Sequence, residues 1–441
     1  MFFQAHPPPP PPSIVVCILD DVSWPDLHAA ETPAIDALRE EGLSFDGFHT
    51  MPVCSSTRLA LWTGRLPRRM GVGEGINHYA PPGPDNPSPA FDLDTLPRVL
   101  SGEGYTTCLI GKWHAGTYAL EGKAIPESSA LKVGGFDRWL AGTPGNLRSK
   151  FGKGYDNWYR VDDGKGALSE EYPTGAQVNA AKLWWGETPG PKFMVLSLNV
   201  PHAPFHTPPE AWRRKEYPSQ RSGRFLEMLE GADLAVEALR SFVGEDSWFF
   251  LISDNGTPPA INGSSKRGKA TTWDRGVRVP MVVVGPGVAD EAQGKRTSGL
   301  VMCTDVYATI AQLAGANGDD TIKRRGGEDS VSFAASFTEG VDFAGRPFAF
   351  SERFETNAKN RGTGDELMIR DQRWKLRRDS GVERLFDLEV RPFEKNGLIP
   401  DKLEGEAREA YERLSGYLKT LPARKWDGPR GKRPGKRTRT Q

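Results

Sequence analysis

The sequence of 441 residues has no run of the roughly 20 consecutive apolar residues that a membrane-spanning helix requires. It also has no excess of charge, because 57 Lys and Arg balance 57 Asp and Glu. Such a balance gives no reason to expect an acidic polymer as partner. From these absences we expect a protein that binds neither a membrane nor a nucleic acid. The length favours two or three domains.

Cysteine is scarce as well. The four cysteines lie far apart and form neither a CxxC pair nor a Cys/His cluster, so the sequence offers no zinc motif. Cys17, Cys108 and Cys303 lie within or directly after apolar runs, a pattern typical of unreactive thiols buried in a core. Cys54 lies instead in the polar segment M-P-V-C-S-S-T-R. It is therefore the cysteine for which we expect a chemical role.

The start of the chain has no basic segment, apolar segment or cleavage site of the kind that makes a secretory signal. We therefore expect a cytoplasmic protein from the sequence as written, and a periplasmic or secreted one if the true N-terminus is longer. Six prolines predict an extended leader over residues 1–12. Residues 422–441 carry eight Lys or Arg against one Asp. They predict a basic disordered tail, with a nucleic-acid-binding arm as the alternative.

Apolar runs alternate with amphipathic segments over residues 13–340. The β-branched run 13–19 predicts a strand that is covered on both faces. Thr32, Pro33 and Gly42 mark the start and end of the helix that follows it. Residues 115–190 show weak periodicity, and we expect long loops around a cleft there. Further strands are expected at 105–110, 193–199, 248–253 and 281–285, and further helices after Cys54 and at 96–100, 225–242 and 305–314. This alternation predicts an α/β fold with a doubly wound, mostly parallel sheet flanked by helices.

The pattern changes after residue 340. Short alternating segments at 348–350, 367–370, 374–377 and 384–388 predict a small antiparallel sheet. A final helix is expected at 404–421. We therefore predict a smaller C-terminal subdomain over residues 341–421.

Polar clusters directly follow four of the predicted strands. In an open α/β sheet, ligands bind at the carboxyl ends of the strands. One such cluster is explained by a strand cap or a turn, but four together favour a ligand site. The clusters are Asp20-Asp21, Gly111 to His114, Pro201-His202 and Asp254-Asn255.

The residues in and near these clusters suggest two kinds of site. Three carboxylates and an amide oxygen form the hard oxygen set that Ca²⁺ or Mg²⁺ takes, and adjacent carboxylates repel each other unless a cation lies between them. The alternative is that these acidic residues form ordinary turns. The metal candidates are Asp20, Asp21, Asp254 and Asn255. Cationic side chains that converge on an oxyanion bind sulfate or phosphate, whereas a lone cation is a solvated surface charge. The cationic candidates are Arg58, Lys112, His114, His202 and Lys269.

The segment P-V-C-S-S-T-R-L-A-L-W-T-G-R, residues 52–65, resembles the signature of the type I sulfatases, in the alkaline phosphatase superfamily. In that family the cysteine of C-x-P-x-R is oxidised to formylglycine. G-Y-T-T-C-L-I-G-K-W-H, residues 104–114, is similar to the second signature of the family. Further segments that resemble the family follow in its order, at 18–21, 201–204, 253–256, 268–280, 304–315 and 370–388. The resemblance covers most of residues 14–390 and implies an alkaline-phosphatase-like α/β domain.

The resemblance also implies a reaction. Cys54 would be converted by a formylglycine-generating enzyme, and an oxygen of the aldehyde hydrate would attack the sulfur of a sulfate ester. The metal, usually Ca²⁺ with Mg²⁺ or Mn²⁺ as alternatives, would be held by Asp20, Asp21, Asp254 and Asn255. The substrate would be a sulfated small molecule or glycan, and a sulfated carbohydrate is favoured.

The remaining roles follow in the same way. Arg58 and Lys112 would orient the modified residue. His114 would take a proton as sulfate is released. His202 and Lys269 would hold the sulfate ester and assist the departing oxygen.

The chain departs from the family pattern at a few positions. Ser56 stands where the motif has proline, and Leu59 where a glycine is common. Asp274 and Arg275 stand in a stretch that often reads E-G-G. Two alternatives stay open. One is a phosphonate monoester or phosphodiester hydrolase of the same superfamily, and the other is a non-catalytic binder of sulfated glycans with Cys54 unconverted.

Overall fold

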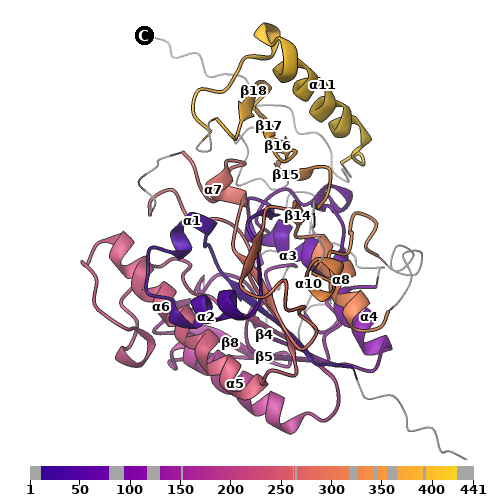
Figure 1. Ribbon diagram of the computed structural model, residues 1–441. Helices are drawn as coiled ribbons and strands as arrows, with labels where there is room; N and C mark the ends of the chain where they lie inside the picture. Colours follow the sequence, from indigo (N-terminus) through magenta and orange to yellow (C-terminus); the bar gives the residue numbers. More distant parts are fainter. Residues whose placement is uncertain are drawn as a thin grey trace, which may run out of the picture.

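The computed structural model is built around one large sheet, whose strands come from β1 to β13 (Figure 1). It has ten strands in the order β13-β2-β12-β11-β1-β10-β4-β5-β8-β9. The structure describes residues 11–78, 94–116, 130–149, 152–261, 263, 266–316, 326–340, 343, 345–354, 365–390 and 394–424. The predicted leader and basic tail lie outside the described residues, apart from 11–12 and 422–424.

The centre of the sheet is parallel, as predicted. β1 (Ile14–Leu19) lies between β10 (Lys192–Ser197) and β11 (Trp248–Ser253) and is parallel to both. β4 (Thr106–Lys112) pairs in parallel with the other side of β10. All six residues of β1 are buried. The carboxyl ends of these four strands therefore meet at one edge of the sheet.

The outer strands make the sheet mixed. On one side, β12 (Met281–Val284) is antiparallel to β11 and to β2 (Leu43–Phe45), and β13 (Lys295–Thr297) is parallel to β2. On the other side, β5 (Arg138–Thr143) is parallel to β4, whereas β8 (Trp158–Asp162) and β9 (Lys165–Ser169) are antiparallel to their neighbours.

The expectation of long loops over residues 115–190 is therefore wrong in part. β5, β8 and β9 lie in this stretch, and so does helix α5 (Pro173–Glu187). The helix packs on β10 and on a neighbouring helix largely through small residues, among them Ala176, Ala180 and Ala181. Small side chains allow close packing but give little hydrophobic periodicity, which is why the sequence pattern was weak.

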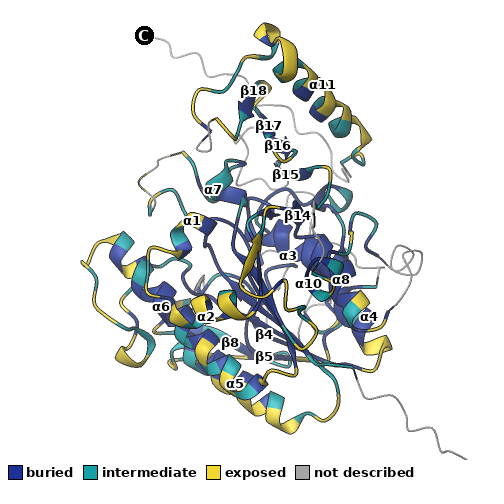
Figure 2. Ribbon diagram, in the orientation of Figure 1, coloured by how far each residue is buried: buried dark blue, intermediate teal, exposed yellow. Residues whose placement is uncertain are grey.

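Helices cover both faces of the sheet (Figure 1). One face is covered by α2 (Pro33–Glu41), α5 and α6 (Arg221–Val243), and the other by α3 (Cys54–Thr63), α4 (Leu96–Gly102) and α8 (Asp305–Leu313). Successive side chains of β1 enter the two cores alternately, as the period of a strand requires. Figure 2 shows the exposed residues on the outer sides of α5 and α6. The shorter elements are α1 (Trp24–Leu27), α7 (Asp274–Val277), α10 (Ala335–Thr338), η1 (Pro67–Met70), η2 (Glu210–Trp212), η4 (Pro400–Lys402), and the pairs β3 (Phe48–His49) with β14 (Val301–Met302) and β6 (Arg148–Ser149) with β7 (Gly152–Lys153).

The predicted small antiparallel sheet is present beside the large one. It consists of β15 (Ala349–Arg353), β16 (Glu366–Arg370), β17 (Trp374–Asp379) and β18 (Val382–Asp387), each antiparallel to the next. α11 (Gly405–Thr420) packs on β16, β17 and β18. We refer to this sheet and α11 as the C-terminal subdomain, and its limits at residues 341 and 421 remain a proposal.

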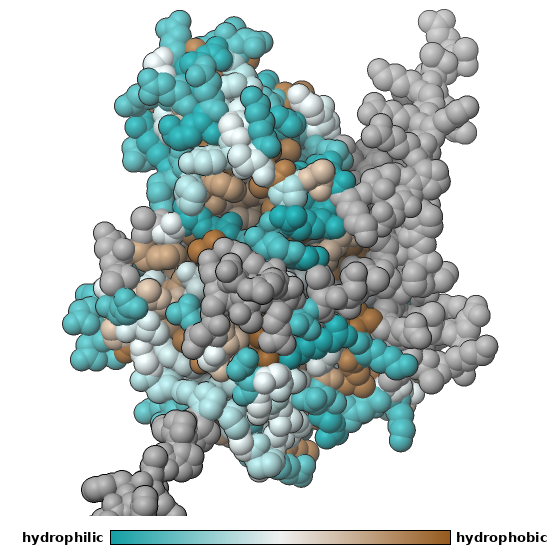
Figure 3. All heavy atoms as spheres, turned by 90° about the vertical axis from the view of Figure 1, so that its right-hand side faces the viewer, coloured by the Kyte–Doolittle hydropathy of each residue, from teal (hydrophilic) through white to brown (hydrophobic). Residues whose placement is uncertain are grey.

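On the face in Figure 3, hydrophilic and hydrophobic residues are interspersed, and the upper part of the view is mainly hydrophilic. Within the described ranges, no helix combines the length and the apolar character that crossing a bilayer requires.

Candidate active site

Two pairs of acidic and amide side chains lie side by side at the carboxyl edge of the large sheet. β1 and β11 pair with Leu19 opposite Ser253, so the residues that follow each strand are neighbours. The backbone N–H of Asp21 donates to Asp254 Oδ1 at 3.2 Å. Asn255 Nδ2 donates to Asp21 Oδ1 at 2.7 Å. The structure thus brings together the residues predicted to bind metal.

Cys54 opens helix α3 directly against this group. Its Sγ lies 3.6 Å from Asp20 Oδ1 and 3.4 Å from Lys269 Nζ. The residue is 3% exposed. Burial raises the pKa of the Cys54 thiol well above its usual range, and the Asp254 carboxylate adds to the rise. Because the thiolate is the reactive form of cysteine, the unmodified thiol is a weak nucleophile here.

Two buried cations form ion pairs with the carboxylates. Arg58 lies one helical turn after Cys54, and its Nε and Nη2 donate to Asp254 Oδ2 at 3.1 and 2.8 Å. Lys112, at the end of β4, places Nζ 2.6 Å from Asp20 Oδ2. Burial alone would raise the pKa of Asp20, but nearby positive charge, chiefly that of Lys112, outweighs the effect of burial and lowers that pKa. The carboxylate is therefore ionised at neutral pH.

Lys269 and His202 approach Asp21 from two loops. Lys269 Nζ lies 2.6 Å from Asp21 Oδ1, and His202 Nε2 lies 3.7 Å from Asp21 Oδ2. Burial favours a neutral Lys269, but the Asp21 carboxylate outweighs it and raises the pKa of the amine. Burial and the charge of Lys269 lower the pKa of His202. At neutral pH the site therefore presents a charged lysine beside a neutral histidine.

His114 is a neutral histidine in which one ring nitrogen has no hydrogen-bond partner among the described residues. Its Nε2 lies 3.2 Å from the carbonyl oxygen of Ile76, an arrangement that assigns the proton to Nε2. Its Nδ1 is buried and has no hydrogen-bond partner among the described residues. Burial lowers the pKa of His114 well below its usual value, and the charge of Lys112 adds to the effect. Nδ1 is thus unprotonated at neutral pH and able to accept a hydrogen bond.

The backbone at His114 departs from the extended conformation of strand β4. β4 ends at Lys112, and His114 has a φ of 47°, in the left-handed region. A non-glycine residue with positive φ is uncommon outside constrained sites. The orientation of His114 therefore follows from this turn and not from the alternation of a strand.

The donor set fits a hard divalent cation. Ligand atoms of Asp20, Asp21, Cys54 and His202 all lie within 4.8 Å of one another. Asn255 Oδ1 is buried without a hydrogen-bond partner in the part of the chain that the structure describes. Carboxylate and amide oxygens are the ligands that Ca²⁺ prefers. Asp254 borders this group, but Arg58 and the Asp21 N–H already engage its oxygens.

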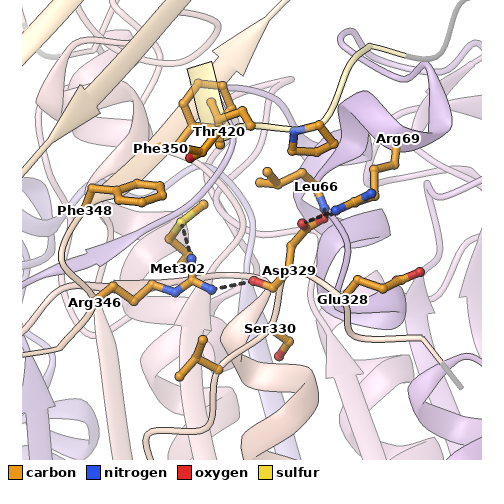
Figure 4. Close-up of a pocket in the computed structure, with 13 residues that line it drawn as sticks. Leu66, Arg69, Met302, Glu328, Asp329, Ser330, Arg346, Phe348, Phe350 and Thr420 are labelled. Atoms are coloured by element: carbon orange, nitrogen blue, oxygen red, sulfur yellow. Dashed lines mark hydrogen bonds and ion pairs between the residues drawn. The ribbon is translucent and has the colours of Figure 1, made fainter. Parts of the chain in front are cut away.

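A pocket of 340 Å³ lies elsewhere, between α11, β15 and the residues near Asp329 (Figure 4). None of its lining residues belongs to the Asp20–Cys54 group. Its charged side chains are already engaged in ion pairs, Arg69 with Asp329, Arg346 with Asp305 and Glu328 with Arg65. We therefore place the candidate active site at the sheet edge.

Several residues at the site carry no motif and were missed from the sequence. Ser197 Oγ donates to the Lys112 carbonyl and accepts from Arg58 Nη1 at 2.6 Å. The ring of His78 packs edge-on against His114, with 5.3 Å between the ring centroids. No spacing or composition pattern distinguishes Ser197 or His78 in the sequence. The three other cysteines are buried free thiols, as predicted.

Comparisons with known proteins give a consistent result. The family model described as Sulfatase matches residues 12–316. N-acetylgalactosamine-6-sulfatase of Sus scrofa is 31% identical over 351 residues, which cover 68% of this chain and 62% of that protein. The chain therefore spans about three fifths of the length of that curated relative.

Two solved structures share the fold. Ps i-CgsB, in complex with k-i-k-neocarrahexaose, has a TM-score of 0.74, 23% identity and coverage of 92% of each chain. BT4656, in complex with its substrate D-glucosamine-2-N,6-O-disulfate, has a TM-score of 0.70 and 16% identity, with coverage of 93% of this chain and 97% of that one.

Proposed function

Because this chain belongs to the sulfatase family, within the alkaline phosphatase superfamily, we propose that it hydrolyses sulfate esters and that its substrate is a sulfated carbohydrate. The relatives support the substrate class, since the similar protein of Sus scrofa is an N-acetylgalactosamine-6-sulfatase and BT4656 has a disulfated glucosamine as its substrate. The reaction itself is supported by the chemistry of the site.

One observation carries the proposal. The Sγ of Cys54 lies within 4.0 Å of two carboxylates and of the Lys269 amine. A thiol in this position has a raised pKa and is poorly suited to act as a thiolate. The Lys269 ammonium group can instead bind an anionic sulfate group, and the two carboxylates can hold a cation beside an oxygen nucleophile. We therefore propose that Cys54 acts after conversion to formylglycine, which supplies a hydroxyl nucleophile on a hydrated aldehyde.

The metal candidates of this chain would hold a divalent cation, with Asp20, Asp21 and Asn255 as the principal oxygen donors and Asp254 beside them. Such a cation, Ca²⁺ or a similar ion, supplies Lewis-acid stabilisation of negative charge. Arg58 holds the Asp254 carboxylate in place through two hydrogen bonds. Lys112 does the same for Asp20.

The other side chains bind the substrate and move protons. Lys269 has a raised pKa, so its ammonium group can hold a sulfate oxygen and neutralise charge on the departing alcohol oxygen. His202, beside Asp21, is placed to share that task. The unpaired Nδ1 of His114 can accept a proton from residue 54 as sulfate leaves.

A matched pair of substrates tests the proposed reaction. The full chain, co-expressed with a formylglycine-generating enzyme, is assayed on an aryl sulfate and on the corresponding aryl phosphonate monoester, with Cys54→Ala as control. We expect faster turnover of the sulfate and no turnover by Cys54→Ala. Preference for the phosphonate would assign the chain to the alternative hydrolase class. Tight binding of a sulfated sugar without turnover would support the non-catalytic alternative.

A panel of sulfated monosaccharides then tests the substrate class. We expect release of inorganic sulfate from at least one amino sugar or galactose derivative. Turnover of aryl sulfates combined with no release from any sulfated sugar would contradict the carbohydrate assignment and leave the reaction in place.

A further inference from the structure

We propose that Arg353 of the C-terminal subdomain is a positioning residue that fixes the two segments on either side of Cys54. One segment carries Lys269, and the other holds His114 through the carbonyl of Ile76. Arg353 ends strand β15 and contacts both segments. The role of these segments in catalysis rests on the proposed function, whereas the contacts themselves do not.

The first contact fixes the Lys269 segment. Arg353 Nη1 donates to the carbonyl oxygen of Ala270 at 2.8 Å. Ala270 has a φ of 65°, a left-handed conformation that an alanine adopts only when its surroundings hold it. Its own N–H donates to the carbonyl of Pro52 at 2.8 Å. Arg353 thus stabilises the turn that directs Lys269 toward Cys54.

The second contact fixes the segment beneath His114. Arg353 Nε lies 2.6 Å from Glu74 Oε1, and the Glu74 side chain is only 4% exposed. Two residues later, the N–H of Ile76 donates to Ser55 Oγ at 3.0 Å, and its carbonyl accepts from His114. One guanidinium therefore links the supports of both proposed catalytic groups.

The planar guanidinium is needed for this double contact. Its N–H groups point in fixed, divergent directions, so Nε and Nη1 can reach two acceptors at the same time. A lysine at the same position carries its donors on a single nitrogen, so it does not reproduce the separate contacts of Nε and Nη1. Loss of the double contact would loosen Lys269 and His114 together without changing either residue.

A neighbouring ion pair provides the matched control. Glu352, next to Arg353 on β15, binds Arg68 with Nε–Oε1 of 2.7 Å and Nη2–Oε2 of 3.0 Å. This pair also joins the C-terminal subdomain to the large sheet domain and is similarly buried. It has no contact with the Lys269 segment or with Glu74 among its hydrogen bonds. Arg68→Gln therefore shows how far a weakened interface between subdomain and sheet domain changes hydrogen exchange and kcat by itself.

The test compares Arg353→Gln, Arg353→Lys and Arg68→Gln in the full chain. Hydrogen exchange followed by mass spectrometry reports the amides of Lys269, Ala270 and Ile76, and it requires neither turnover nor conversion of Cys54. We expect faster exchange at these amides in Arg353→Gln and wild-type exchange in Arg68→Gln. On an aryl sulfate, Arg353→Gln should lower kcat at least about tenfold at equal formylglycine content, because a small misplacement of catalytic groups is costly. Arg353→Lys should recover part of the loss.

The outcomes separate this inference from the proposed function. Equal exchange in Arg353→Gln and Arg68→Gln, or a wild-type kcat in Arg353→Gln, would overturn the positioning role. A wild-type protein that turns over no sulfate ester would overturn the proposed function. In that case the hydrogen-exchange comparison alone supports or refutes the positioning role.

Discussion

The buried pair of Arg58 and Asp254 allows a quantitative prediction. Both side chains are fully buried, and two hydrogen bonds join them. Arg58→Met removes the cation and leaves the Asp254 carboxylate without its main partner. Breaking one side of a buried ion pair costs about 3–5 kcal/mol. This is a large part of the roughly 5–15 kcal/mol by which domains are stable.

A double-mutant cycle measures the coupling between the two residues. Urea unfolding of wild type, Arg58→Met, Asp254→Asn and the double variant is compared in the presence of a chelator. The contacts of Arg58 with Lys112 and Ser197 are lost equally in the single and the double variant, so they cancel. We expect the double variant to be more stable than the sum of the single effects predicts, by at least about 1 kcal/mol.

If the effects of the two single substitutions add up to that of the double variant within about 0.5 kcal/mol, the two residues are not coupled, and this account of the pair is refuted. A second cycle with added Ca²⁺ extends the test to the metal. We expect Asp254→Asn to reduce the stabilisation by Ca²⁺, since Asp254 borders the proposed metal site.

Three further predictions follow from single residues. Ser56 is the third residue of α3, and its Oγ has no hydrogen-bond partner among the described residues. A proline is tolerated in the first turn of a helix, so Ser56→Pro should raise the converted fraction of Cys54 without lowering Tm. Mass spectrometry and thermal unfolding measure the two quantities, and a lowered Tm would contradict the prediction. Added Ca²⁺ should raise Tm, because an ion that binds only the folded chain stabilises it. At a Ca²⁺ concentration one hundred times Kd, the free energy of unfolding should rise by about 2.7 kcal/mol, and Asp21→Asn should abolish most of this rise. Burial lowers the pKa of His49 to about 3, so the unfolded chain binds a proton below about pH 6.5 that the folded chain does not, and stability falls as the pH falls. Between pH 7 and pH 5, His49→Gln should therefore lose about 2 kcal/mol less unfolding free energy than wild type, and equal losses would show that His49 does not cause this part of the pH dependence.

The elements with strong local patterns were predictable. β1, β4, β10 and β11 are apolar runs followed by polar clusters, and a parallel order brings those clusters to one edge. The predicted metal ligands and Lys112 meet there for this reason. Some of the motifs that resemble the sulfatases lie on these strand ends, and the segments that carry Cys54 and Lys269 meet them there. The strand pattern and the resemblance therefore indicated the same site.

The remaining features depend on contacts between distant parts of the chain. α5 buries small residues against its neighbours and shows no clear periodicity. Arg353 and Glu74 are 279 positions apart, and nothing in either local sequence predicts their ion pair. The left-handed conformations of His114 and Ala270 likewise arise from tertiary contacts. Sequence patterns identify which residues carry the chemistry, whereas the supports that orient them become visible only in the fold.

The most direct test of the central claim relates sulfate release to the modification of Cys54. Protein preparations with different converted fractions, obtained by varying the co-expressed formylglycine-generating enzyme, are assayed on one aryl sulfate. The account predicts that the rate rises in proportion to the aldehyde content of the Cys54 peptide and is absent without it. A rate that does not depend on the converted fraction, or no activity in fully converted protein, would contradict the account.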